Sequence, residues 1–220
     1  MAIFARPYSS IVLPKGELAM PCVSDQAYVE AARTGHVVAL PTDTVWGVAV
    51  VPEHSSKLYA LKQRSLEKSL ILMGATAADL WPYVVMDKAQ WQSVTTRYWP
   101  GQLTLVVPAS DRVPLGMHPQ TPETIGVRVP DHPVARQILA LTGPLATTSA
   151  NISGQPNLMS LDEVLTQFPQ VYGFTEKALK MFLELGNFPE KSLVPSGSPS
   201  TVARWQPHGW EILRQGTVHL

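Results

Sequence analysis

The stretch PTDTVWG, residues 41–47, separates two apolar runs of strand length, residues 36–40 and 48–51. Short apolar runs that are bounded by proline or polar residues are typical of buried β-strands. The sequence therefore predicts two core strands joined by a polar elbow. Threonine and aspartate at a strand end can line a binding site, or they can simply satisfy the backbone groups of a loop.

Strand-length and helical patterns alternate outward from this elbow. Further strands are expected at residues 70–73, 103–107, 124–129, 145–148, 201–204 and 210–213. Helices are expected at residues 25–34, 55–62, 77–83, 88–99, 133–142, 160–168 and 176–185. Expected capping residues are Ser55, Asp131, and Ser160 with Glu163 in a capping box. This order predicts an α/β or α+β fold around a mixed, twisted sheet.

Composition limits the classes of protein that fit. The 220 residues, 45% of them hydrophobic, suffice for one domain. Residues 1–22 are expected to form an irregular arm, and residues 23–220 the folded domain. The formal net charge is zero, so an anion site must be local rather than part of a basic field. The lone cysteine, Cys22, excludes an intramolecular disulfide, and no apolar run approaches the roughly 20 residues of a spanning helix. A soluble cytoplasmic protein without a membrane partner is expected.

Two further polar segments follow predicted strands or helices. Lys62, Arg64 and Lys68 form a basic group that suits polyphosphate, although such a group is often a solvated face. Residues 147–154, TTSANISG, are dense in short hydroxyl and amide side chains directly after a strand, where ligands gather in α/β sheets, although a plain turn would look similar. Neither a Walker phosphate loop nor a GxGxxG motif is present, so ATP would have to be bound in another way.

The blocks of sequence, taken together, resemble the YrdC/TsaC family in order and spacing across residues 25–216. They are PTDTVWG (41–47), LKQR with Lys68 (61–68), YWPGQLTLV (98–106), GVRVPDHP (126–133), TTSANISG (147–154), PSTV (199–202) and ILRQG (212–216). The resemblance implies a short, single-domain L-threonylcarbamoyladenylate synthase. Its fold would be a YrdC-like twisted mixed sheet, flanked by helices, with a large concave cavity, and residues 23–220 would be the catalytic domain.

The resemblance also implies the reaction and its ligands. The substrates would be ATP, L-threonine and bicarbonate or CO2, and the products threonylcarbamoyl-AMP and pyrophosphate, for the threonylcarbamoyladenosine modification of tRNA. Mg²⁺ would arrive carried by ATP, and no protein metal site is expected. tRNA and the downstream threonylcarbamoyl-transfer proteins are further candidate partners. No enzyme nucleophile is required, because the carbamate of threonine can attack the α-phosphorus itself.

Roles for single residues follow from the resemblance by position. Lys62, Arg64 and Asn151 are expected to be catalytic, with Lys62 and Arg64 as charges that face the cavity. The expected ATP-binding residues are Arg64, Lys68, Thr124, Ser149, Asn157 and Arg214. The expected threonine-binding residues are Thr44, Arg128, Thr147 and Ser200. Strand alternation independently places Val127 and Val129 on one face and Arg128 on the other, toward water or a cavity.

Some features depart from the family pattern or remain open. Trp46, Ser69 and Met73 replace the tyrosine, proline and histidine common in relatives, and residues 170–198, with Phe182 and Phe188, have no counterpart. Asp43 is expected to be a loop acceptor or a metal ligand. An RNA-binding module is the alternative from another class, and a YrdC-like carbamoyl-adenylate transfer domain without threonine specificity is a third reading. The chain lacks the aromatic strands and basic helix of dedicated RNA readers.

Overall fold

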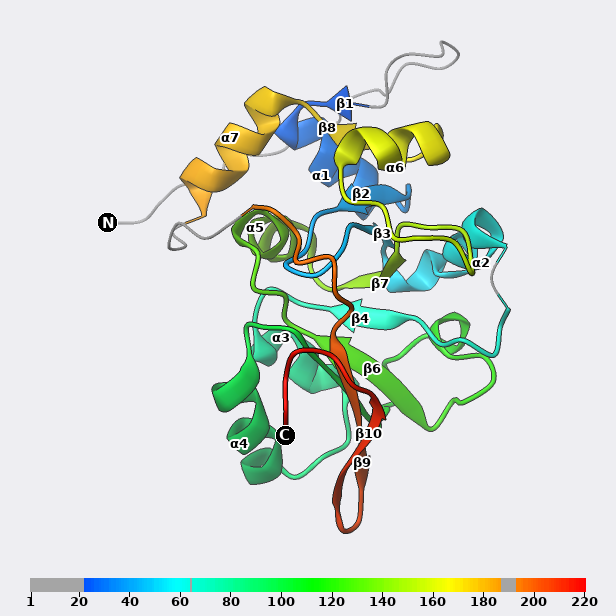
Figure 1. Ribbon diagram of the computed structural model, residues 1–220, viewed down its shortest axis with the longest axis vertical. Coiled ribbons are helices and arrows are strands. Elements are labelled where there is room, and N and C mark those ends of the chain that lie inside the picture. The colour runs from blue at the N-terminus through cyan, green and yellow to red at the C-terminus, as the bar shows by residue number, and fades with distance from the viewer. Residues whose placement is uncertain (1–21, 64, 187–192) are drawn as a thin grey trace.

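A mixed eight-stranded sheet, in the order β10-β9-β5-β6-β4-β7-β3-β2, forms the centre of the molecule (Figure 1). The computed structural model describes residues 22–63, 65–186 and 193–220. The strands are β2 Val38–Leu40, β3 Gly47–Val50, β4 Ile71–Met73, β5 Leu103–Pro108, β6 Thr124–Arg128, β7 Leu145–Ser149, β9 Thr201–Gln206 and β10 Gly209–Arg214, with β1 Cys22–Val23 and β8 Gly173–Phe174 in a separate parallel pair. The predicted mixed sheet is confirmed.

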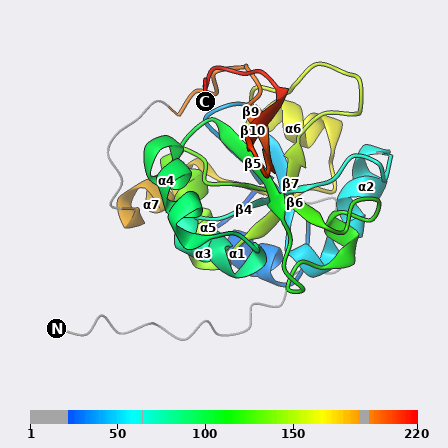
Figure 2. The ribbon, with the colours of Figure 1, turned by 90° about the horizontal axis from the view of Figure 1, so that it is seen from below.

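Helices cover the sheet on both sides. They are α1 Asp25–Arg33, α2 Ser56–Lys62, α3 Ala77–Leu80, α4 Lys88–Tyr98, α5 Pro133–Thr142, α6 Leu161–Gln167 and α7 Glu176–Leu185, with the 3₁₀ turns η1 Pro52–His54, η2 Trp81–Tyr83 and η3 Leu115–Met117. Figure 2 shows α3, α4 and α5 on one side of the sheet, and α2 and α6 on the other. None of the helices in the described ranges is long and apolar enough to span a membrane.

The central strand β4 decides which side chains meet. It pairs in parallel with β6 and antiparallel with β7, so that Ile71 lies opposite both Gly126 and Thr147, and Met73 lies opposite Arg128. Leu72 and Met73 are buried, as expected for a central strand that is covered on both faces. The register therefore brings Arg128 and Thr147, which are far apart in the sequence, to the two flanks of one strand.

Helices α1, α5 and α7 pack together at the end of the molecule that is opposite the β9–β10 hairpin (Figure 1). The fully buried ring of Tyr28 makes edge contacts with Phe174 and Phe182 at centroid distances of 5.5 and 5.8 Å. Part of the stretch without a family counterpart therefore builds this core through Phe182, whereas Phe188 lies outside the described residues. Gly35, after α1, has φ +81°, and a Cβ there would lie 1.6 Å from His54 Nδ1, so this turn requires glycine.

Three capping predictions need correction. Ser55 makes no side-chain cap, because η1 runs directly into α2 and leaves Ser55 with helical dihedrals, φ −55° and ψ −27°. Helix α5 begins with Pro133 in its first position, so His132 rather than Asp131 is the N-cap, and its Nδ1 accepts from Ala135 N at 3.3 Å. At α6, Ser160 Oγ accepts from Glu163 N, but the Glu163 carboxylate accepts from Met159 N instead of closing the predicted box.

Candidate functional site

A polar cavity of about 160 Å³ lies against the central strands. Its walls come from the elbow of residues 42–47, from β4, β6 and β7, and from the C-terminal part of the chain. Polar side chains predominate where the elbow and strand ends meet, and Leu40, Ile71 and Met73 supply an apolar wall. The cavity thus offers both hydrogen-bonding groups and a hydrophobic surface to one small ligand.

The elbow is shaped by the hydroxyl group of Thr42. This oxygen donates to Val45 O at 2.6 Å, and it accepts from the backbone N–H groups of Thr44 and Val45 at 3.2 Å. A hydroxyl that bonds to backbone groups two and three residues later fixes a tight turn. The turn directs Thr44 to the cavity, where its Oγ1 lies 2.9 Å from Thr42 Oγ1.

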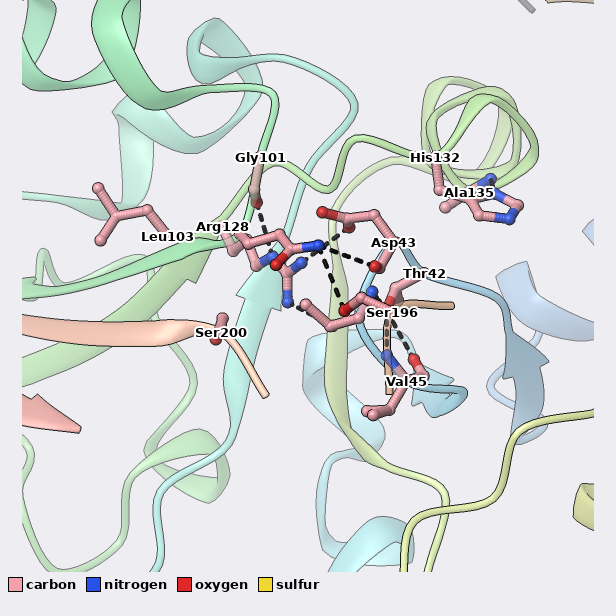
Figure 3. A network of polar contacts seen from close by, with 12 residues as sticks. Thr42, Asp43, Val45, Gly101, Leu103, Arg128, His132, Ala135, Ser196 and Ser200 are labelled. Carbon is pink, nitrogen blue, oxygen red and sulfur yellow. Dashed lines mark hydrogen bonds and ion pairs between the residues drawn. The ribbon is translucent and has the colours of Figure 1, made fainter. Parts of the chain in front are cut away.

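Arg128, the last residue of β6, lines the cavity and is held by three hydrogen bonds (Figure 3). Its Nε donates to Gly101 O at 3.0 Å, one terminal nitrogen donates to Thr44 Oγ1 at 3.0 Å, and the other donates to Asp43 Oδ1 at 2.7 Å. Arg128 is only 3% exposed. Burial lowers the pKa of its guanidinium group; Asp43 opposes this shift, and Arg214 adds to it. Alternation predicted that Arg128 faces water or a cavity, and the structure shows the cavity.

Arg214, the last residue of β10, supplies a second guanidinium group to the same cavity. Its Nε donates to Ser200 O at 3.0 Å, and its Nη2 donates to Ser200 Oγ at 3.2 Å. Ser200 Oγ in turn lies 2.9 Å from Thr104 Oγ1 on β5. Partial burial lowers the pKa of Arg214. The side chain is therefore anchored on one side and still reaches the cavity.

Lys62 lies behind the cavity rather than in it. Its side chain is 1% exposed, and its ammonium group donates to Thr148 Oγ1, Ser149 Oγ and Asn151 Oδ1 at 3.1 to 3.2 Å, and to Ser149 O. Lys62 is therefore a buried group that bonds to residues of the cavity wall, and its predicted catalytic role stays a prediction. Lysine at the end of α2 reaches under the strand end of β7 and ties together the TTSAN segment.

Asn151 completes this arrangement. Its Oδ1 accepts from Lys62 and from Ser149 Oγ, and its Nδ2 donates to Gln155 O at 2.6 Å. Its amide group is thus engaged at both ends and orients the loop after β7, in agreement with a role in arranging the polar shell.

The structure brings most of the predicted ligand-binding residues together. Those that line the cavity are Thr44, Arg128, Thr147, Ser149, Asn157, Ser200 and Arg214. Thr124, at the start of β6, and the exposed Lys68 are outside the lining. Arg64 lies outside the described residues, so its predicted roles stay predictions.

Trp46, Ser69 and Met73, the positions that depart from the family pattern, all line the cavity. The resemblance had identified them as departures from the family pattern whose effect on the pocket was open. Gln102 was missed altogether: its Nε2 donates to Asp43 O at 3.0 Å, and its Oε1 accepts from Thr217 Oγ1 at 2.6 Å. Gln102 directly precedes the apolar strand β5. A glutamine at such a position gives no local signal of a long-range bridge.

The carboxylate of Asp43 forms an ion pair with Arg128, so it binds a side chain of the protein itself. Within the described ranges, no group of three or more histidine, cysteine, aspartate or glutamate side chains could hold a metal ion. The charged side chains among the described lining residues are Arg128 and Arg214. A cavity of this kind suits an anionic ligand that also presents hydrogen-bonding groups.

The fold and this cavity define an α/β protein with a polar cavity at the ends of central strands, lined by two arginine side chains among the described residues. The chain belongs to the Sua5/YciO/YrdC family, whose model, described as "Telomere recombination", matches residues 30–216. It is similar to the threonylcarbamoyl-AMP synthase of Vibrio cholerae, with 41% identity over 148 residues that cover 64% of this chain and 78% of the relative. The threonylcarbamoyl-AMP synthase of Stutzerimonas stutzeri is 38% identical over 152 residues, which cover 66% of this chain and 80% of that protein.

Solved structures show the same fold. P. abyssi Sua5 complexed with L-threonine superposes with a TM-score of 0.74 and 26% identity, over 87% of this chain and 54% of that chain. E. coli YciO, at 22% identity, superposes with a TM-score of 0.69 over 88% of each chain.

Proposed function

We propose that this chain is an L-threonylcarbamoyladenylate synthase, a nucleotidyltransferase that acts in the cytoplasm. It forms threonylcarbamoyl-AMP and pyrophosphate from ATP, L-threonine and bicarbonate or CO2, for the threonylcarbamoyladenosine modification of tRNA. The observation that carries the proposal is the convergence of Thr44, Arg128, Thr147 and Ser200 on one cavity, in a chain similar to relatives that bear this name.

The threonine subsite is centred on Arg128. A guanidinium group has five N–H donors, and three of those on Arg128 are used in its bonds to Gly101, Thr44 and Asp43. Two donors remain for a carboxylate, which a guanidinium group binds well with paired bonds. Thr44, Thr147 and Ser200 surround this point with hydroxyl groups, and Met73 and Ile71 offer apolar surface to the methyl group of threonine.

The nucleotide subsite uses the other residues of the cavity and its rim. Arg214, Ser149 and Asn157 lie in the lining, and Lys68, Thr124 and Arg64 are proposed to extend the subsite toward the phosphates. Lys62 and Asn151 support it from behind by holding Ser149. Mg²⁺ is proposed to enter on the phosphates of ATP and to offset their charge.

The chemistry follows from the substrates. The amine of threonine adds to CO2 and loses a proton, which gives a carbamate. A carbamate oxygen then attacks the α-phosphorus, and the bond to the β-phosphate oxygen breaks, so that pyrophosphate leaves with the electron pair. The protein supplies positioning and a preorganised set of cationic and hydroxyl donors for the charge that develops on the phosphoryl oxygens.

The two other candidate functions lack a supporting observation of this kind. A dedicated RNA-binding module would not need the enclosed subsite around Arg128. A carbamoyl-transfer domain would share the adenylate chemistry but would not require threonine. tRNA and the proteins that transfer the threonylcarbamoyl group are proposed to act on the product and not to bind in the cavity.

Pyrophosphate release tests the proposal directly. Purified protein is supplied with ATP, Mg²⁺ and bicarbonate, with or without L-threonine, and pyrophosphate is measured together with the adenylate product by mass spectrometry. We expect release that depends on threonine. Equal release without threonine would favour the carbamoyl-transfer reading, and no release under either condition would remove the enzymatic proposal. Heat-denatured protein is the control.

A further inference from the structure

Asp43 is a buried carboxylate that contacts the threonine subsite through Arg128. Its side chain is 10% exposed, and its Oδ1 accepts from Arg128 at 2.7 Å. Its Oδ2 is buried and has no hydrogen-bond partner among the described residues. Asp43 does not itself line the cavity. Asp43 therefore acts on a ligand indirectly, through its contact with Arg128 and through the electrostatic field of its carboxylate.

The position of Asp43 is fixed from two directions. Its backbone oxygen accepts from Ser196 N at 3.1 Å and from Gln102 Nε2 at 3.0 Å, which links it to the C-terminal segment and to the start of β5 (Figure 3). The elbow that Thr42 closes holds it from the other side. A carboxylate held in this way keeps its charge at a constant place behind the guanidinium group.

The charges around the subsite are unequal in their effect on different anions. Asp43 offsets the charge of Arg128. The second charged side chain among the described lining residues is Arg214. The Asp43 carboxylate weakens the attraction of Arg128 for any anion, and it does so about twice as much for a dianionic phosphate group as for a monoanionic carboxylate at the same place. An amino acid is also zwitterionic, and its ammonium group is attracted by the same carboxylate.

We propose that Asp43 is a specificity-determining residue, which makes the Arg128 subsite select the carboxylate of a zwitterionic amino acid and reject phosphate-type anions. This inference rests on the proposed function, because ATP and pyrophosphate must be kept out of the threonine subsite in the same cavity. An arginine with no carboxylate behind it would bind phosphate readily. Asp43 removes that competition while leaving two guanidinium donors for the amino acid.

The test is calorimetric titration of L-threonine into wild type and Asp43→Asn, each with and without inorganic phosphate. Asparagine keeps the shape of the side chain and removes its charge. Glu184→Gln, an exposed position on α7, is the control that loses one negative charge elsewhere. In the wild type and in the control, phosphate should leave threonine affinity unchanged. In Asp43→Asn, threonine affinity should fall about tenfold or more, and phosphate should become a competitor of threonine.

Several results would overturn the inference. Wild-type behaviour of Asp43→Asn would do so, and so would a loss of threonine binding with no gain of phosphate competition, because Asp43 would then only hold Arg128 in place. Breaking a buried ion pair can unfold a protein, so the wild type gives an independent test: phosphate that competes with threonine there contradicts the inference whatever the variant does. A wild type that binds no threonine would instead refute the proposed function and, with it, this inference.

Discussion

Replacement of Lys62 by methionine separates a supporting role from a direct role in catalysis. Methionine keeps most of the length and volume of the buried side chain and removes its ammonium group. The ammonium group bonds to oxygens of Thr148, Ser149 and Asn151. Since this site is 1% exposed, water cannot easily replace the lost donor, and the segment after β7 should loosen.

The size of the effect follows from those bonds. The hydroxyl groups can turn to other partners, and Asn151 Oδ1 keeps its bond from Ser149 Oγ, so the main loss falls on the carbonyl oxygen of Ser149. One buried acceptor without a donor costs about 1 to 3 kcal/mol. A net loss of about 2 kcal/mol would lower the melting temperature by about 4 to 8 °C in a domain of this size. ATP affinity should fall as well, because Ser149 lies in the cavity lining.

The assay combines thermal unfolding with ATP titration, and Lys57→Met is the matched control. Lys57 lies on the same helix but is exposed, and its ammonium group donates to Gly35 O. A double-mutant cycle with Asn151→Ala should show coupling, since both residues hold the same segment. The reasoning would be refuted if Lys62→Met melted like Lys57→Met, lost turnover all the same, and combined additively with Asn151→Ala. Lys62 would then act on the substrate.

Two further predictions concern Arg128 and His132. Arg128→Lys should weaken threonine binding about tenfold or more and ATP binding much less, because lysine cannot reproduce the forked contact; unchanged threonine affinity with weakened ATP affinity, measured by calorimetry, would assign Arg128 to the other substrate. Burial lowers the pKa of His132, so the folded protein keeps it neutral where the unfolded chain, with a pKa near 6.5, takes up a proton. The stability it confers is therefore complete above that pH and lost as the pH falls below it. His132→Asn, which can still cap α5, should reduce the loss of unfolding free energy between pH 7 and pH 5, and equal losses in both proteins would contradict this.

Local sequence patterns predicted the elements because the physical signals are local. Apolar runs of three to six residues became buried strands, as at β4 and β5, and the alternation around Arg128 gave the correct face. The capping errors have an equally local cause. Ser55 and Asp131 are good capping residues by type. The turn η1 leaves Ser55 with helical dihedrals at the N-cap position, and the position of Pro133 moves the cap of α5 from Asp131 to His132.

It was easier to predict from the sequence which residues belong to the site than how deeply each of them is buried. The family resemblance assigned one role, threonine binding, to Thr44, Arg128, Thr147 and Ser200. These four residues share one cavity. Nothing in the sequence distinguishes a lysine that contacts a ligand from one that lies a layer deeper, because both occur as a basic residue at the end of a helix. The depth of Lys62 is set by how α2 packs against β3 and the end of β7, which is a tertiary property.

The closure of the cavity depends on contacts that no local pattern encodes. Ser196 N and Gly197 N donate to Asp43 O and Thr44 O, and Gln102 bridges Asp43 to Thr217. Each bond joins segments separated by more than 50 residues. The bonds to Asp43 O and Thr44 O lie on the same elbow whose side chains bind Arg128. The backbone of residues 43 and 44 is thus held by the C-terminal part of the chain while their side chains orient the guanidinium group. The hydrogen bonds from residues 196 and 197 therefore add to the Thr42 turn in holding Asp43 and Thr44 in a fixed direction, which makes the C-terminal part of the chain a structural component of the proposed threonine subsite.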